Sequence, residues 1–432
     1  MKIEKYSIGI GDRFGMEGVA QLRALQAAEE MGVSIVPVWN KSNREHTLIG
    51  TSPDDVRRAA DSAVDTSGWA ASYYVDADHI GIANVDRFLS ASDFYTIDVA
   101  DFIGKPPQTD LRNGFVSAIE PFVGDFSIPG IARKFRVSKT MIAAFIDKYS
   151  AAIAEAGKVY RYIEERKGKE TFITEISVDE AANPQTPIEL FFILALIARE
   201  DIPVQTIAPK FTGAFLKGID YVGDIDQFTR EFQDDLAVVA FAVERFHLPD
   251  NLKLSIHSGS DKFSLYPAIY SAIRKYDTGL HLKTAGTTWL EEVIGLAAAG
   301  GEGLQLAKEV YAQSFKRFDE LAKPYLPVIH IDKMKLPSPK EVELWNSQKF
   351  VGTLRHDSSN AAYNVNFRQL VHIGFRVAAD MGDRYKDLLR EYRLEIEANV
   401  TTNLLDRHIV PLFLGKRMSK KSDEPASRTT DS

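Results

Sequence analysis

Short apolar runs alternate along the chain with longer segments whose apolar residues recur at helical spacing. Runs rich in β-branched and aromatic residues predict strands. We expect eight strands, at residues 6–11, 34–38, 73–76, 171–178, 202–207, 253–257, 280–284 and 369–373. Strands that alternate with helices form parallel sheets, and eight parallel strands close a barrel. The pattern therefore predicts the α/β class and a single (β/α)8 TIM barrel.

Polar residues mark the beginnings of several predicted helices. Ser52 before Pro53 is typical of an N-cap followed by proline at the first helical position. Ser138 stands before the long amphipathic run 139–167, and Asp226 stands before the run 227–246. These residues predict where three of the helices around the barrel begin.

The spacing between the predicted strands is uneven. About 90 residues separate the third strand from the fourth and about 80 separate the seventh from the eighth, far more than a crossover needs. We expect insertions after strands 3 and 7, at about 82–170 and 290–367, that build a wall or lid over the catalytic face. Residues 1–415 then form one barrel domain, and the Lys- and Ser-rich tail 416–432 is expected to be disordered.

Composition narrows the chemistry. The 432 residues include 52 basic and 60 acidic side chains, a formal net charge of −8, and no cysteine. A protein with this net negative charge lacks the positive surface potential that binds polyanions, so we expect no nucleic-acid partner. Without cysteine there is no thiol nucleophile and no thiolate metal site, so a metal must be held by histidine and carboxylate.

The most apolar helical stretch, residues 187–198, contains Glu189 and is shorter than the roughly 20 residues of a bilayer span. Met1 leads directly into a short apolar run without a signal-peptide core. We therefore expect a cytoplasmic protein with no membrane partner.

Ionisable residues gather at the carboxyl ends of the predicted strands, where barrels carry their chemistry. They are Asp12, Arg13, Asp76, Asp78, His79, Asp179, Glu180, Lys210, His257, Asp261, Lys262, His281, Lys283 and His372. Each alone has an ordinary explanation, such as a helix cap for an aspartate or a buried core position for His281. Their coincidence at one end of the barrel is not explained by packing, and it favours an enzyme.

The strings VDADH and LSIHSGSD place His79 and His257 after different strands. Two imidazoles and one carboxylate make a site that suits a single divalent ion such as Zn, Mn, Co or Ni. The turn His-Ser-Gly-Ser also presents backbone N–H groups that can bind an anion.

These two strings resemble the zinc-dependent class II aldolases. A broader resemblance rests on KYSIGIGDRFG, SVDEAANPQTPIELFFI, QTIAPKFTGAFLKGIDYVGD, HSGSDKFSLYP and LHLKTAGTTWLEE, which together span residues 5–292. In these segments the chain is similar to the tagaturonate/fructuronate epimerases. The resemblance implies a metal-dependent sugar-acid epimerase with a small-molecule sugar or sugar-acid substrate, and relatives that act on fructose and tagatose.

That reaction inverts a carbinol carbon β to the ketone, which simple enolisation cannot do. Two routes to this inversion remain: transient oxidation by NAD, and retro-aldol cleavage followed by re-formation of the bond. The pair Gly9 and Gly11 follows a strand but lacks the rest of the dinucleotide fingerprint, so no NAD is expected. A divalent metal would stabilise the enediolate of a retro-aldol step, which is the route we expect.

Roles follow from position along these strings. His79 and His257 are expected as metal ligands, and Asp224 and Asp220 of KGIDYVGD compete as the third, although Asp224 also fits a helix entry. Asp78 and Glu180 are the expected acid/base pair, with Glu175 and Asp179 as alternatives to Glu180. Substrate-binding roles are expected for Arg13, Gln185, Lys210, Lys283 and His281.

Three other functions fit the same sequence: an aldolase that releases its fragments, a sugar-binding barrel without catalysis, and an aldose–ketose isomerase resembling xylose isomerase. The last class prefers several carboxylates with one histidine around two metals, which the two histidines here do not match. The sequence leaves open the choice between a uronate and a neutral ketohexose, the metal, and the oligomeric state, with a homo-oligomer compatible.

Overall fold

Eight parallel strands close into a barrel in the computed structural model, which describes residues 1–106, 109–284 and 287–415. They are β1 (Tyr6–Gly11), β2 (Val36–Ser42), β3 (Tyr74–Ile80), β4 (Phe94–Asp98), β7 (Ile173–Ser177), β8 (Thr206–Ala208), β9 (Lys253–His257) and β10 (Leu280–Lys283). The order around the barrel is β1-β10-β9-β8-β7-β4-β3-β2. β5 (Gly124–Phe126) and β6 (Phe135–Val137) form a separate antiparallel pair. The predicted (β/α)8 barrel is therefore confirmed.

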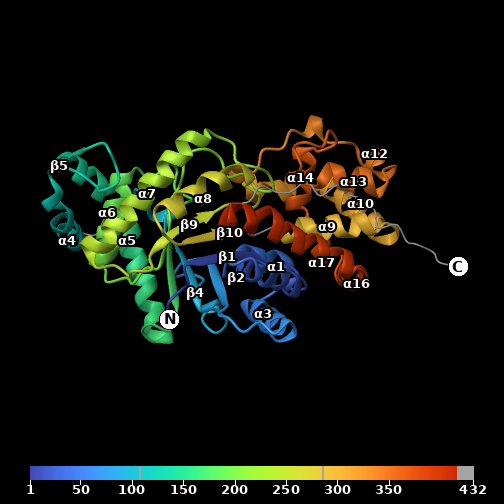
Figure 1. Ribbon diagram of the computed structural model, residues 1–432, viewed down its shortest axis with the longest axis horizontal. Helices are drawn as coiled ribbons and strands as arrows, with labels where there is room; N and C mark the ends of the chain where they lie inside the picture. The colour runs from blue at the N-terminus through green and yellow to red at the C-terminus, as the bar shows by residue number, and fades with distance from the viewer. Residues whose placement is uncertain (107–108, 285–286, 416–432) are drawn as a thin grey trace.

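Helices surround the barrel and continue beyond it. Those up to β10 are α1 (Gly18–Glu30), α2 (Asn43–Ile49), α3 (Pro53–Ser67), α4 (Thr109–Ile119), α5 (Lys139–Lys167), α6 (Pro187–Arg199), α7 (Ile225–Phe246) and α8 (Tyr266–Lys275). After β10 come α9 (Thr287–Ala299), α10 (Gly301–Lys316), α11 (Phe318–Ala322), α12 (Pro339–Glu343), α13 (Ser347–Leu354), α14 (Val365–Ile373), α15 (Phe375–Asp380), α16 (Asp383–Glu391), α17 (Arg393–Thr402) and a last helical segment, Asn403–Leu414. Figure 1 shows α4–α6 on one side of the barrel and α9–α17 on the other.

One predicted strand is wrong and one observed strand was not predicted. Residues 369–373 belong to helix α14, whose residues Asn366–Ile373 are all buried. A helix buried on every side shows no polar stripe, so its apolar run reads like a strand. The missing strand is β4, inside the segment 82–170 that was predicted to be an insertion. It follows β3 after only a short 3₁₀ turn, Val85–Arg87, so the expected helix between two strands is absent.

Because β4 is a strand and 369–373 is helical, the long connections follow other strands than predicted. The first long connection follows the fourth barrel strand and carries α4, the β5–β6 hairpin and α5. The segment 290–367 follows the last barrel strand, so it opens a C-terminal helical region and does not interrupt the barrel. His372 accordingly lies on α14 and not at a strand end. The tail 416–432, predicted to be disordered, lies outside the described residues.

Two of the three predicted caps lie where expected. Ser52 and Ser138 are the N-caps of α3 and α5, and Ser138 accepts a hydrogen bond from the Met141 N–H. Helix α7 is capped by Asp224 and not by Asp226, because its carboxylate accepts the Gln227 N–H at 3.0 Å.

A buried charge cluster ties the C-terminal helices to the mouth of the barrel. Asp261, in the segment after β9, pairs with Arg368 of α14 at 2.6 Å, and both side chains are fully buried. Arg368 also donates from Nε to the Gly218 carbonyl, in the loop after β8, at 2.6 Å. His356 lies 3.1 Å and His408 3.4 Å from the Asp261 carboxylate. The cluster, named here the Asp261 cluster, thus fixes two loops that follow barrel strands.

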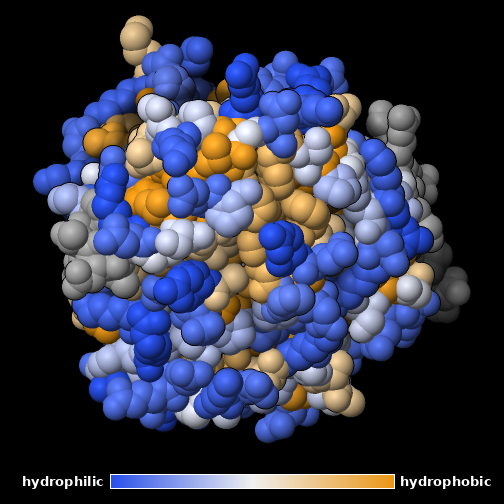
Figure 2. Space-filling view, turned by 90° about the vertical axis from the view of Figure 1, so that its left-hand side faces the viewer, coloured by the Kyte–Doolittle hydropathy of each residue, from blue (hydrophilic) through white to orange (hydrophobic). Residues whose placement is uncertain are grey.

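The face that carries α4, β5 and α6 shows apolar atoms among the polar ones (Figure 2). Val123 and Met141 are 40% and 42% exposed in this region. Among the described residues, no helix combines the length and the apolar character that crossing a membrane requires.

Candidate active site

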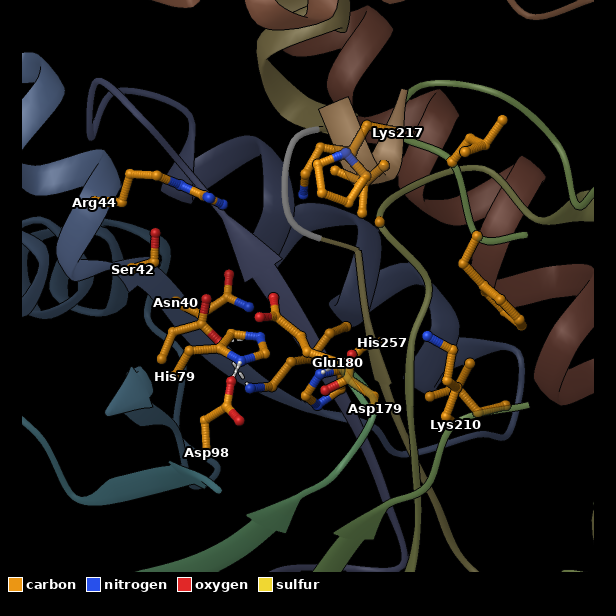
Figure 3. A pocket seen from close by; sticks show the side chains of 18 of the residues that line it. Asn40, Ser42, Arg44, His79, Asp98, Asp179, Glu180, Lys210, Lys217 and His257 are labelled. Carbon is orange, nitrogen blue, oxygen red and sulfur yellow. Dashed lines mark hydrogen bonds and ion pairs between the residues drawn. The ribbon is translucent and has the colours of Figure 1, made fainter. Parts of the chain in front are cut away.

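A cavity of about 710 Å³ opens at the carboxyl ends of the barrel strands. The strand residues that line it are Asn40 of β2, Asp78 and His79 of β3, Asp98 of β4, His257 of β9 and Lys283 of β10. Asp179 and Glu180 after β7, and residues 209–211 and 213–217 after β8, complete this part of the wall. Pro324, Pro327 and Val328 close one side from the C-terminal region. The polar side chains converge from several strands on one space (Figure 3).

Two histidines from opposite parts of the chain meet in this cavity. The rings of His79 and His257 lie edge to face, with centroids 5.1 Å apart. His79 Nδ1 lies 2.8 Å from Asp98 Oδ2, and His257 Nε2 lies 2.8 Å from Glu175 Oε1. Asp179 Oδ2 is 3.1 Å from His257 Nδ1, close enough for an ion pair but not aligned as a hydrogen bond.

The carboxylates make this end of the cavity favourable for positive charge. Burial lowers the pKa of both rings, but the surrounding carboxylates together outweigh it. Asp78, Asp98 and Asp179 raise the pKa of His79 to about 10, and Asp179 and Glu175 raise that of His257 to about 9. His79 also has a left-handed backbone, with φ of 52°. Strained backbone of this kind persists only where its surroundings hold it, and it gathers at functional sites.

Nitrogen and oxygen donors converge closely enough for one metal ion. Ligand atoms of His79, Asp179 and His257 all lie within 4.8 Å of one another, and so do those of His79, Asp98 and Glu180. Imidazole and carboxylate are donors that Zn, Mn, Co and Ni accept. The two groups share His79.

Lys283 lies beneath the histidines and joins three carboxylates. Its ammonium is 2.8 Å from Asp76, 2.8 Å from Asp78 and 3.2 Å from Glu175, and it donates to Thr96. Burial alone would raise the pKa of Asp78, but Lys283 and the histidines lower it to about 2. Burial raises the pKa of Asp76 to about 7; Lys283 opposes the rise, and the charges of Asp78 and Glu175 add to it.

The predicted acid/base residues differ in their surroundings. Asp78 is buried and ion-paired with Lys283. Glu180 lines the cavity, is exposed, and has no hydrogen bond or ion pair among the described residues. Of the alternatives, Glu175 is hydrogen-bonded to His257 and Asp179 forms an ion pair with it. Lys283 and His257 hold the pKa of Glu175 well below its usual value despite burial.

The structure does not bring the two predicted third ligands to the histidines. Asp224 is exposed and caps α7, and Asp220 accepts hydrogen bonds from the N–H and hydroxyl of Ser264. Neither lines the cavity. Both carboxylates are occupied in holding the loop after β8, and Asp179 lies beside the histidines instead.

The five predicted substrate-binding residues have different positions. Lys283 and Lys210 line the cavity, and Lys210 donates to the Ala181 carbonyl. Gln185 lies behind the wall, where it accepts the Lys210 N–H at 2.7 Å. His281 is buried inside the barrel, 2.9 Å from Ser7 Oγ, and burial lowers its pKa to about 3. Arg13 lies behind Glu45, paired with it at 3.0 Å.

Several cavity residues were not singled out from the sequence, among them Asp98, Asn40, Arg44 and Lys217. Asp98 ends the strand that was missed, and Asn40 lies two residues beyond the predicted end of the second strand. Arg44 lies in the first turn of α2, a helix too short to show a clear period, and Lys217 lies in the segment after β8. Asn40 is 3% exposed, and neither its Oδ1 nor its Nδ2 has a partner among the described residues.

A closed (β/α)8 barrel whose mouth gathers histidines, carboxylates and a buried lysine around one cavity defines an enzyme of the (β/α)8 class. A family model described as tagaturonate epimerase matches residues 1–410. The chain therefore belongs to the tagaturonate epimerase family and is an epimerase, within the isomerase class.

Individual relatives agree. The chain is 30% identical over 386 residues to the tagaturonate/fructuronate epimerase of Thermotoga maritima, a match that covers 85% of this chain and 72% of that protein. The native crystal structure of fructuronate-tagaturonate epimerase UxaE from Cohnella laeviribosi is similar with a TM-score of 0.76 and 24% identity, covering 95% of this chain and 82% of that one. A glycerol complex of the same protein matches equally. These structures support the fold.

Proposed function

We propose that this protein interconverts D-tagaturonate and D-fructuronate by inverting the carbinol carbon β to the ketone. The observation that carries the proposal is the convergence of His79 and His257, with their carboxylates, on one cavity at the barrel mouth. The relative from Thermotoga maritima, named for these two sugar acids, supports the same pair of substrates.

The donor set supports one divalent ion as cofactor. His79, His257 and Asp179 would hold it, because their ligand atoms converge and His257 Nδ1 lacks an aligned hydrogen bond. When bound, the ion supplies positive charge that polarises the substrate ketone and stabilises an enediolate. Lys283 fixes Asp78 as an anion beside His79, which adds to the preference for a cation.

The remaining residues fit a retro-aldol route. Glu180 is the carboxylate best suited as base, because it lines the cavity and nothing among the described residues occupies it. It takes the proton of the hydroxyl on the carbon to be inverted. The bond from that carbon to its neighbour beside the ketone then breaks, and its electron pair passes into the ketone-bearing fragment. The aldehyde fragment turns its other face, the bond forms again, and Glu180 returns the proton.

The test is metal analysis joined to turnover. We expect the purified protein to contain a divalent metal, to epimerise D-tagaturonate, and to lose turnover on chelation and regain it with Zn, Mn, Co or Ni. His257→Asn should lower both metal content and kcat. Borohydride added during turnover should trap a three-carbon aldehyde.

Two outcomes contradict parts of the proposal. If no divalent ion supports epimerisation of tagaturonate, fructuronate, tagatose or fructose, the function is wrong. If active protein instead contains stoichiometric NAD, the retro-aldol route is wrong while the epimerase activity stands.

A further inference from the structure

The cavity has a second, cationic end formed by the first turn of α2 and the loop after β8. Arg44 and Lys217 line this end, and Glu45 is the carboxylate that lines it with them. In Figure 3, Arg44 and Lys217 lie across the cavity from Asp98, Asp179 and His257. Most carboxylates of the cavity therefore gather at the histidine end, around Lys283, whereas Arg44 and Lys217 lie at the other end.

Glu45 does not neutralise this end, because Arg13 already pairs with it. Arg13 NH2 lies 3.0 Å from Glu45 Oε1, and the guanidinium stacks on the Phe375 ring at 4.3 Å. Arg13 Nε and NH1 are buried and have no partner among the described residues. Three cations thus face one carboxylate, and the excess charge is positive.

Lys217 has no anionic partner of its own. Its backbone N–H donates to the Val328 carbonyl, which fixes the loop, but its ammonium makes no hydrogen bond or ion pair with the described residues and lies 6.0 Å from the centre of the Tyr325 ring. Burial lowers the pKa of Lys217, Glu45 offsets this in part, and Arg13 and Arg44 lower it further. An anion bound here would therefore pair with an ammonium that has no ion-pair partner among the described residues.

Arg44 is held in place without using its charge. Its NH1 donates to the Pro324 carbonyl at 3.3 Å, and its guanidinium lies over the Tyr325 ring at 4.8 Å. Neither contact neutralises it, and the side chain lines the cavity. A guanidinium beside an ammonium is an arrangement that binds carboxylate well.

Asn40 lies on the cavity wall and requires polar partners. Its buried amide offers two donors and an acceptor with no partner among the described residues. A buried amide left unpaired is costly, so a bound molecule with hydroxyl groups would satisfy it.

We propose that Lys217 and Arg44 bind the carboxylate of an open-chain sugar acid whose ketone lies at the His79–His257 end, and that they set the preference for a uronate over a neutral ketohexose. This inference rests on the proposed function. It assigns the substrate's direction in the cavity: the carboxylate lies toward the start of α2 and the loop after β8, the ketone toward the histidines, and the hydroxyl groups along Asn40.

The experiment compares substrates and ligands that differ only in the carboxylate. Lys217→Met should raise KM for D-tagaturonate by about 10- to 100-fold, the size expected for losing a charge-assisted hydrogen bond. Its kcat/KM for D-tagatose should change by less than about threefold, since a neutral sugar gains little from the ammonium. Lys217→Arg, which keeps the charge, should retain most of the uronate preference.

Binding of unreactive ligands gives a readout that does not depend on turnover. D-mannonate and D-mannitol share a carbon chain, and only the first carries a carboxylate. The wild-type protein should bind D-mannonate more tightly by calorimetry, and Lys217→Met should bring the two affinities together. Lys335→Met removes an exposed lysine outside the cavity, paired with Asp332 at 3.8 Å, and should leave the ratio unchanged.

The two proposals fail differently. If the wild-type protein epimerises none of the sugars, the proposed function fails, and the ratio of D-mannonate to D-mannitol affinity still tests the carboxylate site. If Lys217→Met retains its circular dichroism and melting temperature but loses uronate and neutral substrate equally, or keeps the wild-type affinity ratio, the assignment of Lys217 is overturned.

Discussion

At the scale of single residues, Lys283 is the side chain on which the electrostatics of the site depend. Asp76, Asp78 and Glu175 are buried around it, with Asp76 and Glu175 fully buried. Removing one partner of a buried ion pair leaves the others uncompensated in a medium of low polarity. The lysine therefore acts on stability as well as on the site.

We expect Lys283→Met to lower the free energy of unfolding by about 3–5 kcal/mol. Lys283→Met with Asp76→Asn should recover part of this loss, since the second change removes one of the uncompensated carboxylates. Urea denaturation at pH 7 measures both. A loss below about 1 kcal/mol for the single variant would show that the carboxylates become protonated at little cost.

The histidines predict a pH dependence of the metal-free protein. Their pKa values, raised to about 10 and about 9, mean that the folded state holds these protons more tightly than the unfolded state. The stabilisation is complete below the ordinary histidine pKa of about 6.5 and is lost as pH rises through 9 and 10. The melting temperature should therefore fall between pH 7 and pH 10, with a smaller fall in His257→Asn. An equal fall in that variant would assign the effect to other groups.

Sequence reasoning at this scale succeeded where a residue ends a recognisable strand. His79 and His257 follow apolar runs, and the structure brings them together. It could not separate Asp220 or Asp224 from Asp179, because a capping aspartate and a ligating aspartate look alike in a string. Asn40 and Lys217 carry no chemical signature of their own. Only the geometry shows that the Asn40 amide has no partner among the described residues and that Lys217 lines the cavity.

At the scale of elements, the barrel could be predicted because fully buried parallel strands are short continuous apolar runs. Seven of the eight predicted segments overlap barrel strands. The exchange of 369–373 for β4 shows the limit. A helix buried on all sides imitates a strand, and β4 lacks the long helix that normally separates two parallel strands.

The loop after β8 supplies a prediction about Asp224. Because this carboxylate caps α7, Asp224→Ala should lower the free energy of unfolding by about 1 kcal/mol. Metal content should stay at the wild-type value, because the residue does not line the cavity. Denaturation and elemental analysis together check both parts. Loss of the metal with unchanged stability would restore Asp224 as a ligand.

At the scale of the whole molecule, the cavity is built jointly by the barrel and the C-terminal helices. Pro324, Pro327 and Val328 form part of its wall, and the Asp261 cluster fixes the loops that present Lys217 and Gly259. The C-terminal region has its own apolar core, against which Phe14, Leu48 and Ile49 pack, and the buried charges of the Asp261 cluster add to these contacts. Barrel and helices therefore form one working unit.

Arg368→Met should lower the free energy of unfolding by about 3–5 kcal/mol, because it leaves the buried Asp261 carboxylate without its guanidinium partner. Asp261→Asn in the same chain should restore part of that stability. Activity should fall even in the more stable double variant, since Gly218 loses its contact with α14. Stability and kcat recovering together would show that the cluster serves stability alone.

The Asp261 cluster also bears on how the protein is made. Asp261 and Arg368 are separated by 107 positions, and His408 comes later still. A nascent chain that has completed β10 therefore carries a carboxylate destined for burial whose counter-charge has not been synthesised. The barrel mouth reaches its final form only near the end of translation. A truncated mRNA that ends after β10 would encode every strand of the barrel, and its product would still lack a complete cavity.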